Sequence, residues 1–320
     1  MPLLDSTYRP GVFFRNGHLA TIYSALFRKV DSPEQTRERI TLPDGDFLDL
    51  DWSRAQPPAD KVLILLHGLE GNAQRPYMTG SARLFSSHGY DVCAVNLRGC
   101  SGEPNLLFRS YHSGATEDLD AVFQHILNTG KYKNIYLKGF SLGGNLILKF
   151  LGERSQYSSR IAGAAVVSVP CDLHDSLLQL NKPKNWLYAR KFLSTLREKV
   201  LEKQKRFPEQ ITVAEVEKIR SLKDFDDLYT SKAHGFTDAI DYYTQCSSLR
   251  FLEGIRVPTL LLNARNDSFL GPRCYPVDTC RNHDAVYFEN PDYGGHVGFV
   301  GEGGYFYSEQ RSLEFLDGCE

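Results

Sequence analysis

The sequence predicts an α/β fold in which a mostly parallel central sheet is covered by helices on both faces. Short apolar runs typical of buried strands recur along the chain, most clearly from Val62 onward, and stretches with helical spacing of apolar residues separate them. This alternation is typical of parallel sheets, because each parallel connection crosses the sheet through a helix. The chain has 320 residues, so we expect a single domain over residues 1–320 that carries one insertion.

The expected elements follow from these runs in chain order. The strand runs are short and rich in aliphatic residues, whereas the helical runs are longer and amphipathic. We expect strands at Phe47–Trp52, Val62–Leu66, Val92–Asn96, Asn134–Lys138, Ala164–Val169, Thr259–Asn263 and Val286–Glu289. We expect helices at Tyr77–Ser87, Glu117–Leu127, Leu142–Gly152, Asp238–Cys246 and Glu309–Leu316.

The alternation lapses between residues 170 and 235, where the sequence becomes helical and charged. Leu193, Leu196 and Val200 follow helical spacing, and we expect this stretch to form an inserted helical lid. A solvated helix face explains its positive charge; a second hypothesis is peripheral contact with anionic lipid or with the anionic head group of an acyl substrate. The basic residues are Lys182, Lys184, Arg190, Lys191, Arg197, Lys199, Lys203, Lys205 and Arg206.

Composition excludes several classes of function. The formal net charge of −2 creates no overall field that would attract nucleic acid, which we do not expect as a partner. Clustered histidines and carboxylates are missing, and no Gly-x-Gly-x-x-Gly follows an early strand, so we expect no metal and no cofactor. The cysteines lack Cys-x-x-Cys or zinc-ligand spacing, and we expect free thiols in a reducing compartment. They are Cys93, Cys100, Cys171, Cys246, Cys274, Cys280 and Cys319.

The first residues show no targeting pattern. Met1 to Asp5 lack the basic and apolar regions of a signal peptide. Nowhere does an uncharged apolar run approach the ~20 residues that cross a bilayer. We therefore expect a cytoplasmic protein without a transmembrane segment.

Ser141 is the candidate nucleophile. It is the serine of a Gly-x-Ser-x-Gly string that runs from Gly139 to Gly143, between an expected strand and an expected helix. A serine on such a sharp turn is exposed at the carboxyl end of the sheet, and flanking glycines give the turn the space that it needs. Because a hydroxyl is a weak nucleophile near neutral pH, it needs a base and a pocket that stabilises an oxyanion.

The base and the acid are sought after the serine, because this strand-turn-helix arrangement uses the chain order Ser, Asp or Glu, His. His296 is the expected base, since it lies in a glycine-rich loop just after the last expected strand. His283 precedes that strand and is expected in a surface loop. Asp267 is the expected acid, because it stands at the carboxyl end of the apolar run that starts at Thr259. Weaker alternatives for the acid are Asp278, Asp284 and Asp292.

The oxyanion pocket is expected to combine two backbone N–H groups. One belongs to Leu142, the residue after the nucleophile, and the other to Leu69, where an early buried strand breaks into His-Gly-Leu-Glu-Gly. His67 is expected to hold this loop by hydrogen bonds, not to act in catalysis. We also favour structural roles for Cys100 and His112, because no nucleophile turn surrounds either of them.

Taken together, these strings resemble the YheT-like branch of the α/β-hydrolase superfamily. The resemblance implies a serine hydrolase of the carboxylesterase type that cleaves short- to medium-chain or lipid-like carboxylic esters, with its triad at Ser141, Asp267 and His296. The strings that carry it are Asn16–Ile22, Leu42–Asp46, His67–Gly71, Arg98–Asn105, Ser110–Gly114, Ser141–Asn145, Asp238–Tyr243 and Gly294–Phe299.

Three alternatives share this machinery. An acyltransferase would resolve the acyl-enzyme with an alcohol in place of water, and relatives of that kind occur in the branch. A peptidase would use the same residues on an amide. A binding protein would keep the fold and lose catalysis, which usually shows as a missing triad member, and none is missing here.

Overall fold

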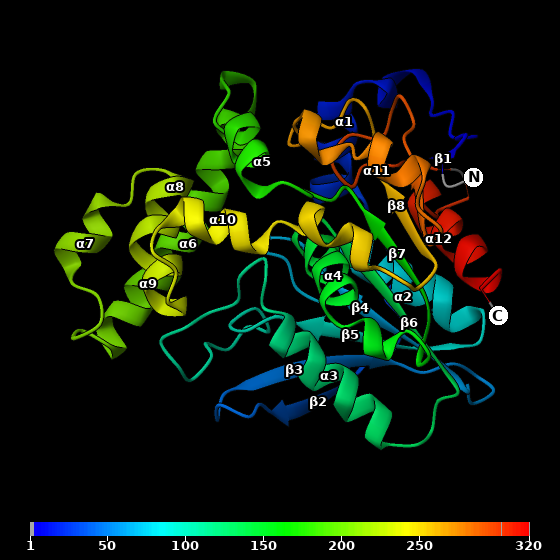
Figure 1. Cartoon of the computed structure of the whole chain (residues 1–320), viewed down its shortest axis with the longest axis horizontal. Coiled ribbons are helices and arrows are strands. Elements are labelled where there is room, and N and C mark those ends of the chain that lie inside the picture. Colours follow the sequence, from blue (N-terminus) through cyan, green and yellow to red (C-terminus); the bar gives the residue numbers. More distant parts are fainter. Residues whose placement is uncertain (1–2, 302, 320) are drawn as a thin grey trace.

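A computed structural model describes residues 3–301 and 303–319, and these form a nine-stranded mixed sheet with helices on both faces (Figure 1). The strand order is β1-β9-β8-β7-β6-β4-β5-β3-β2. All neighbours are parallel except β3, which is antiparallel to both β5 and β2. The strands are β1 Leu3–Leu4, β2 Thr36–Thr41, β3 Phe47–Ser53, β4 Lys61–Leu66, β5 Tyr90–Asn96, β6 Asn134–Phe140, β7 Ile161–Val167, β8 Thr259–Leu262 and β9 Val286–Glu289.

The predicted fold class is confirmed, and each of the seven expected strands is present. Strand β7 is shifted from the expected run, because it starts at Ile161 and the chain leaves the sheet at Ser168, where φ is 55°. Strand β2 was not predicted, since its sequence Thr-Arg-Glu-Arg-Ile-Thr is almost entirely polar. Its stability comes from its neighbour β3: Arg37 and Arg39 each form a bidentate ion pair with a carboxylate of that strand.

Helices cover both faces of the sheet. Helices α3 and α4 pack their apolar residues on one face, whereas α2 and α12 pack on the other, together with Tyr8 and Phe299. The helices are α1 Gly17–Ile22, α2 Pro76–Ser87, α3 Thr116–Asn128, α4 Leu142–Glu153, α5 Leu173–Leu180, α6 Trp186–Arg206, α7 Val213–Lys218, α8 Leu222–Phe225, α9 Ser231–His234, α10 Ala239–Cys246, α11 Val277–Arg281 and α12 Tyr307–Asp317.

Helices α5 to α9 lie between β7 and β8 and fall within residues 170–235, which we call the helical insertion. They extend to one side of the sheet, on the left in Figure 1, and have apolar clusters of their own. Helix α10 follows and connects the insertion back to the core; Asp238 caps its first turn through Asp241 N–H at 2.8 Å. In the ranges 3–301 and 303–319, no helix has the length and apolar character that a membrane crossing needs.

Candidate active site

Ser141 occupies the sharp turn between β6 and α4. Its φ of 51° and ψ of −118° lie outside the usual regions for a residue with a side chain. The turn is so tight that a Cβ on Gly139 would come within 2.6 Å of Gly143 O, and a Cβ on Gly143 within 2.6 Å of His67 O. The two glycines of the motif are therefore required by close backbone packing, as the sequence indicated.

The structure brings Ser141, His296 and Asp267 together, although they come from three separate loops. His296 Nε2 lies 2.9 Å from Ser141 Oγ, and His296 Nδ1 lies 2.8 Å from Asp267 Oδ2. The Asp267 side chain is fully buried, and its other oxygen accepts the Phe269 N–H at 2.9 Å. The ring of Phe269 also contacts the imidazole, with centroids 4.3 Å apart. This constellation has the geometry of an activated nucleophile, a base and an orienting acid.

The N-terminal segment holds the loops that carry the base and the acid. Thr21 Oγ1 accepts the His296 N–H at 2.9 Å and donates to Gly17 O at 2.7 Å. A Cβ on Gly17 would come within 2.4 Å of Asn266 O, and a Cβ on Gly295 within 2.3 Å of Gly17 O. Sequence reasoning missed these roles. The only signal was the Asn16–Ile22 string, which carried the family resemblance without any assigned function.

Residues with a side chain and a positive φ gather at this edge of the sheet. Within the described chain they are Glu70, Ser141, Ser168 and Val297, and each lies in a loop beyond the carboxyl end of a strand. Ser168 Oγ accepts the Val297 N–H at 2.9 Å, so two of these strained residues hold each other in place. Strained backbone clusters at functional sites, where the surrounding structure must fix it.

Backbone donors for an oxyanion lie beside Ser141. Leu142 is the first residue of α4, and the first N–H groups of a helix have no acceptor within the helix. The loop that carries Leu69 passes close to the serine: a Cβ on Gly68 would be 3.1 Å from Ser141 Cβ. A hydrogen bond from Gly71 N–H to Gly68 O at 3.0 Å closes this turn.

His67 has the contacts of a structural residue. It is fully buried, its Nδ1–H donates to Gly68 O at 2.8 Å, and its Nε2 accepts the Leu97 N–H at 3.1 Å. Burial lowers the pKa of His67 to about 4, so the ring stays neutral at physiological pH. Cys100 is also buried, and desolvation raises the pKa of its thiol to about 11, which disfavours a nucleophilic thiolate.

Neither of the other two histidines, His283 and His112, contacts Ser141 or Asp267 in the part of the chain that the structure describes. His283 accepts the Ala285 and Val286 N–H groups at 3.0 Å and contacts Leu252 O at 2.9 Å, so it supports the start of β9. His112 is buried against His234, with ring centroids 4.2 Å apart, and burial lowers its pKa well below the ordinary value. These contacts are typical of structural histidines.

A cavity of about 900 Å³ opens above Ser141 and His296. Its walls are mostly apolar and come from helices α5, α6, α8 and α10, with Ile22 and Leu26 on the N-terminal side. Lys184 and Lys191 of the insertion also line it. Such a volume and lining suit a ligand with a long apolar part.

Several basic residues of α6 contact the main fold, not solvent. Lys199 Nζ bonds Glu70 Oε1 at 2.9 Å, and Lys203 Nζ bonds Asn105 Oδ1 at 2.6 Å and also Leu107 O. Arg206 donates to Asn105 O at 2.8 Å. The view of the whole basic stretch as a solvated face therefore does not hold for these three side chains.

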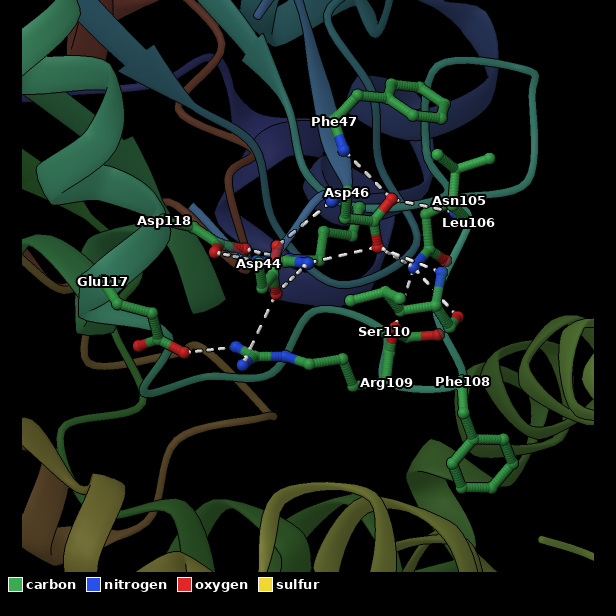
Figure 2. Close-up of polar contacts among 12 residues, drawn as sticks. Asp44, Asp46, Phe47, Asn105, Leu106, Phe108, Arg109, Ser110, Glu117 and Asp118 are labelled. Atoms are coloured by element: carbon green, nitrogen blue, oxygen red, sulfur yellow. Dashed lines mark hydrogen bonds and ion pairs between the residues drawn. The ribbon is translucent and has the colours of Figure 1, made fainter. Parts of the chain in front are cut away.

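The loop that receives Lys203 and Arg206 is fixed by buried charges (Figure 2). Asp46 accepts the Phe47 N–H at 3.0 Å, the Leu106 N–H at 2.8 Å and the Asn105 side-chain amide at 2.6 Å. Burial would raise the pKa of Asp46, but these hydrogen bonds outweigh burial and hold the pKa below its usual range. Arg98 Nη1 lies 3.1 Å from the same carboxylate. The buried Asp46 thus anchors residues 105–107, which also accept hydrogen bonds from Lys203 and Arg206 of the insertion.

Comparison with known proteins identifies the class. Residues 61–302 match the α/β hydrolase fold family. The chain is 35% identical to YheT of Escherichia coli K12, over 90% of this chain and 85% of that protein. It is 31% identical to phospholipase ABHD3 of Mus musculus, over 93% of this chain and 74% of that protein. The chain belongs to the α/β-hydrolase family and, within it, to the YheT-like branch.

Solved structures agree on the fold. The esterase Pf2001 of Pyrococcus furiosus superposes with a TM-score of 0.60 at 19% sequence identity, covering 91% of this chain and 96% of that chain. Its similarity supports the architecture alone. The curated relatives make the chain an esterase/lipase-type α/β hydrolase.

Proposed function

We propose that the protein is a serine hydrolase of carboxylic esters that works through an acyl-enzyme on Ser141. The observation that carries this proposal is the continuous hydrogen-bond chain from Ser141 Oγ through His296 to Asp267, with distances of 2.9 and 2.8 Å. His296 takes the serine proton as the hydroxyl attacks the ester carbonyl. Asp267 keeps the proton of the imidazole on Nδ1, so that Nε2 is free to act as the base.

The tetrahedral intermediate places negative charge on the former carbonyl oxygen. We assign its stabilisation to the N–H groups of Leu69, in the loop after β4, and of Leu142, the first residue of α4. Collapse of the intermediate expels the alcohol with a proton from His296. Water activated by the same imidazole then attacks the acyl-enzyme and releases the acid. In such sites, the loss of one oxyanion donor typically lowers turnover by about 100- to 1,000-fold.

The cavity supports an ester whose acyl part is apolar, because the insertion and the N-terminal segment together line about 900 Å³ beside the nucleophile. We therefore infer that the insertion acts as a lid over the acyl site. The curated relatives ABHD3, named as a phospholipase, and YheT, named as an esterase, agree with an ester bond as the target.

The test is a panel of esters of graded acyl length with Ser141→Ala as the blank. Ser141→Ala should abolish turnover and labelling by a fluorophosphonate, whereas the native chain should show both. Turnover that persists in the variant would contradict the assignment. Analysis of products with added alcohol separates hydrolysis from acyl transfer, since a transferase forms a new ester in place of the free acid.

We also propose that the rim of the cavity makes peripheral contact with an anionic lipid surface. Leu26 and Leu187 line the cavity yet are 75% and 70% exposed, and Lys184 and Lys191 lie beside them. Charge reversal at both lysines should weaken binding to vesicles that contain phosphatidylserine, whereas Lys205→Glu, on the last turn of α6, should not. Unchanged vesicle binding by the double variant would contradict this contact.

A further inference from the structure

The turn that carries the proposed oxyanion donor Leu69 has a conformation that needs support. The next residue, Glu70, has a φ of 53°, which is unfavourable for a residue with a side chain. Such a residue keeps its conformation only where its surroundings fix it. The peptide that joins Leu69 to Glu70 therefore depends on the contacts of Glu70, and it directly follows the peptide that carries the Leu69 N–H.

One support comes from the main fold. The buried Tyr111 hydroxyl accepts the Glu70 N–H at 2.8 Å and donates to Glu70 Oε1 at 2.7 Å. It thus holds the backbone and the side chain of the same residue. These two hydrogen bonds orient Glu70 toward Tyr111. A neutral hydroxyl is not a counterion, so the carboxylate needs a positive charge from elsewhere.

The counterion comes from the helical insertion. Lys199 of α6 reaches down so that its Nζ lies 2.9 Å from Glu70 Oε1, and only 5% of the Glu70 side chain is exposed. The lysine also lies 3.4 Å from Cys100 Sγ. Burial alone would lower the pKa of Lys199, but its contacts with Cys100 and with the Glu70 carboxylate outweigh burial and raise the pKa above the ordinary value. The lysine is therefore charged in this pocket.

The second oxygen of the carboxylate increases the dependence on Lys199. Glu70 Oε2 is buried and has no hydrogen-bond partner in the part of the chain that the structure describes. A buried carboxylate that loses its counterion tends to move toward water. For Glu70 such a movement would break the bond to Tyr111 and release the strained backbone next to Leu69.

We propose that the ion pair between Lys199 and Glu70 positions the Leu69 N–H for the oxyanion, so that acyl transfer requires the helical insertion to be docked on the main fold. Lys199 and Glu70 are then positioning residues, and neither takes part in the chemistry. The inference rests on the proposed function, because it needs an oxyanion to be stabilised at Leu69.

The experiment compares Lys199→Met with the native full chain on a short acetyl ester, which leaves most of the cavity empty. We expect kcat to fall by about 10- to 100-fold with an unchanged KM, below the ceiling of about 1,000-fold for complete loss of one donor. Lys199→Arg should restore most of the turnover, since a guanidinium can also pair with the carboxylate. A boronic acid that forms a tetrahedral adduct with the serine should lose affinity by the same factor as kcat/KM.

Two further variants separate positioning from general damage. Glu70→Gln should reproduce the loss of kcat, and the double variant with Lys199→Met should lose no more than either single variant, because both remove one interaction. Glu70→Gln also gives a second measurement if Lys199→Met does not fold. Lys203→Met is the matched control. This lysine holds the same helix against residues 105–107 and not against the loop of Leu69. We therefore expect kcat to stay within about twofold of the native value.

The outcomes are distinguishable from failure of the proposed function. If the native chain does not turn over esters, or if Ser141→Ala is as active, the proposed function fails first. If Ser141→Ala is inactive but Lys199→Met keeps native kcat and native boronate affinity, only the positioning inference is overturned. An equal loss of kcat in Lys203→Met would also overturn the positioning inference. The effect would then come from weakened docking of the helix in general and not from the pair of Lys199 with Glu70.

Discussion

Arg98 offers a quantitative test of how the loop beneath the insertion is held. Its side chain is 2% exposed and forms a bidentate pair with Asp118, at 2.7 Å from Nε and 2.6 Å from Nη2. Its Nη1 lies 3.1 Å from Asp46 and 2.8 Å from Asp44. Arg98→Met removes the guanidinium and keeps an unbranched apolar stem, so the carboxylates lose their counterion while the packing around the stem is largely kept.

The substitution should lower the free energy of unfolding mainly through Asp118. Asp46 keeps the side-chain amide of Asn105 and the backbone N–H of Leu106, and Asp44 is partly exposed to water. Asp118 is 3% exposed and loses both bonds to the guanidinium. Breaking a buried pair by removal of one partner typically costs about 3–5 kcal/mol. We expect that loss in the free energy of unfolding at pH 8, out of a total that is usually about 5–15 kcal/mol.

The loss should depend on pH, and its direction follows from the protonation of Asp118. Burial raises the pKa of this carboxyl even while Arg98 lies beside it. Without the guanidinium the pKa in the folded state rises further, whereas the unfolded chain keeps a value near ~3.9. Between these two pKa values the folded variant binds more protons than the unfolded chain. Its stability therefore falls as pH rises through this window and recovers as pH is lowered.

The assay is urea unfolding of the native chain and Arg98→Met at pH 5, 6, 7 and 8. The difference between the two should shrink toward pH 5. Arg265→Met is the control, because its pair with Asp292 is about two-thirds exposed and should contribute less than about 1 kcal/mol at any pH. A difference below about 1 kcal/mol at pH 8 for Arg98→Met, or one that is the same at pH 5, would refute the reasoning, given the usual cost of an unpaired buried charge.

Three further substitutions test the site. Thr21→Val removes the acceptor of the His296 N–H and should lower both kcat and the free energy of unfolding, the latter by about 1 kcal/mol in thermal scans. Gly68→Ala places a methyl group 3.1 Å from Ser141 Cβ, and should slow labelling by a fluorophosphonate while the melting temperature changes little. Asp267→Asn should lower kcat by about 1,000- to 10,000-fold at unchanged KM, since the amide favours the wrong tautomer of the base; native turnover would exclude Asp267 as the acid.

The residues proposed for the chemistry could be found from the sequence because local patterns mark them. Ser141 lies between a strand run and a helix run, Asp267 follows a strand run, and His296 lies in a glycine-rich loop after the last one. In a parallel sheet the carboxyl ends of the strands meet at one edge, so the order of these runs already implies that the loops converge. The structure gives the distances between them, which no local pattern contains.

The supporting contacts could not be predicted in the same way. Thr21 and His296 are 275 positions apart, and a threonine in a short helix carries no local sign of its partner. Strand β2 was missed for a related reason, because its charged side chains are stabilised by carboxylates of the adjacent strand and not by burial of an apolar face. Contacts of this kind depend on the finished fold.

The position of the insertion predicts different roles for its lysines Lys199 and Lys203. Lys199 reaches the loop after β4, and Lys203 reaches the loop after β5, so both dock at the edge of the sheet where Ser141 lies. A helix of 21 residues that is held on two loops at one edge cannot move away from the sheet without breaking both contacts. Because the first of these loops also carries Leu69, we expect movement of the insertion to change the geometry of the proposed oxyanion pocket.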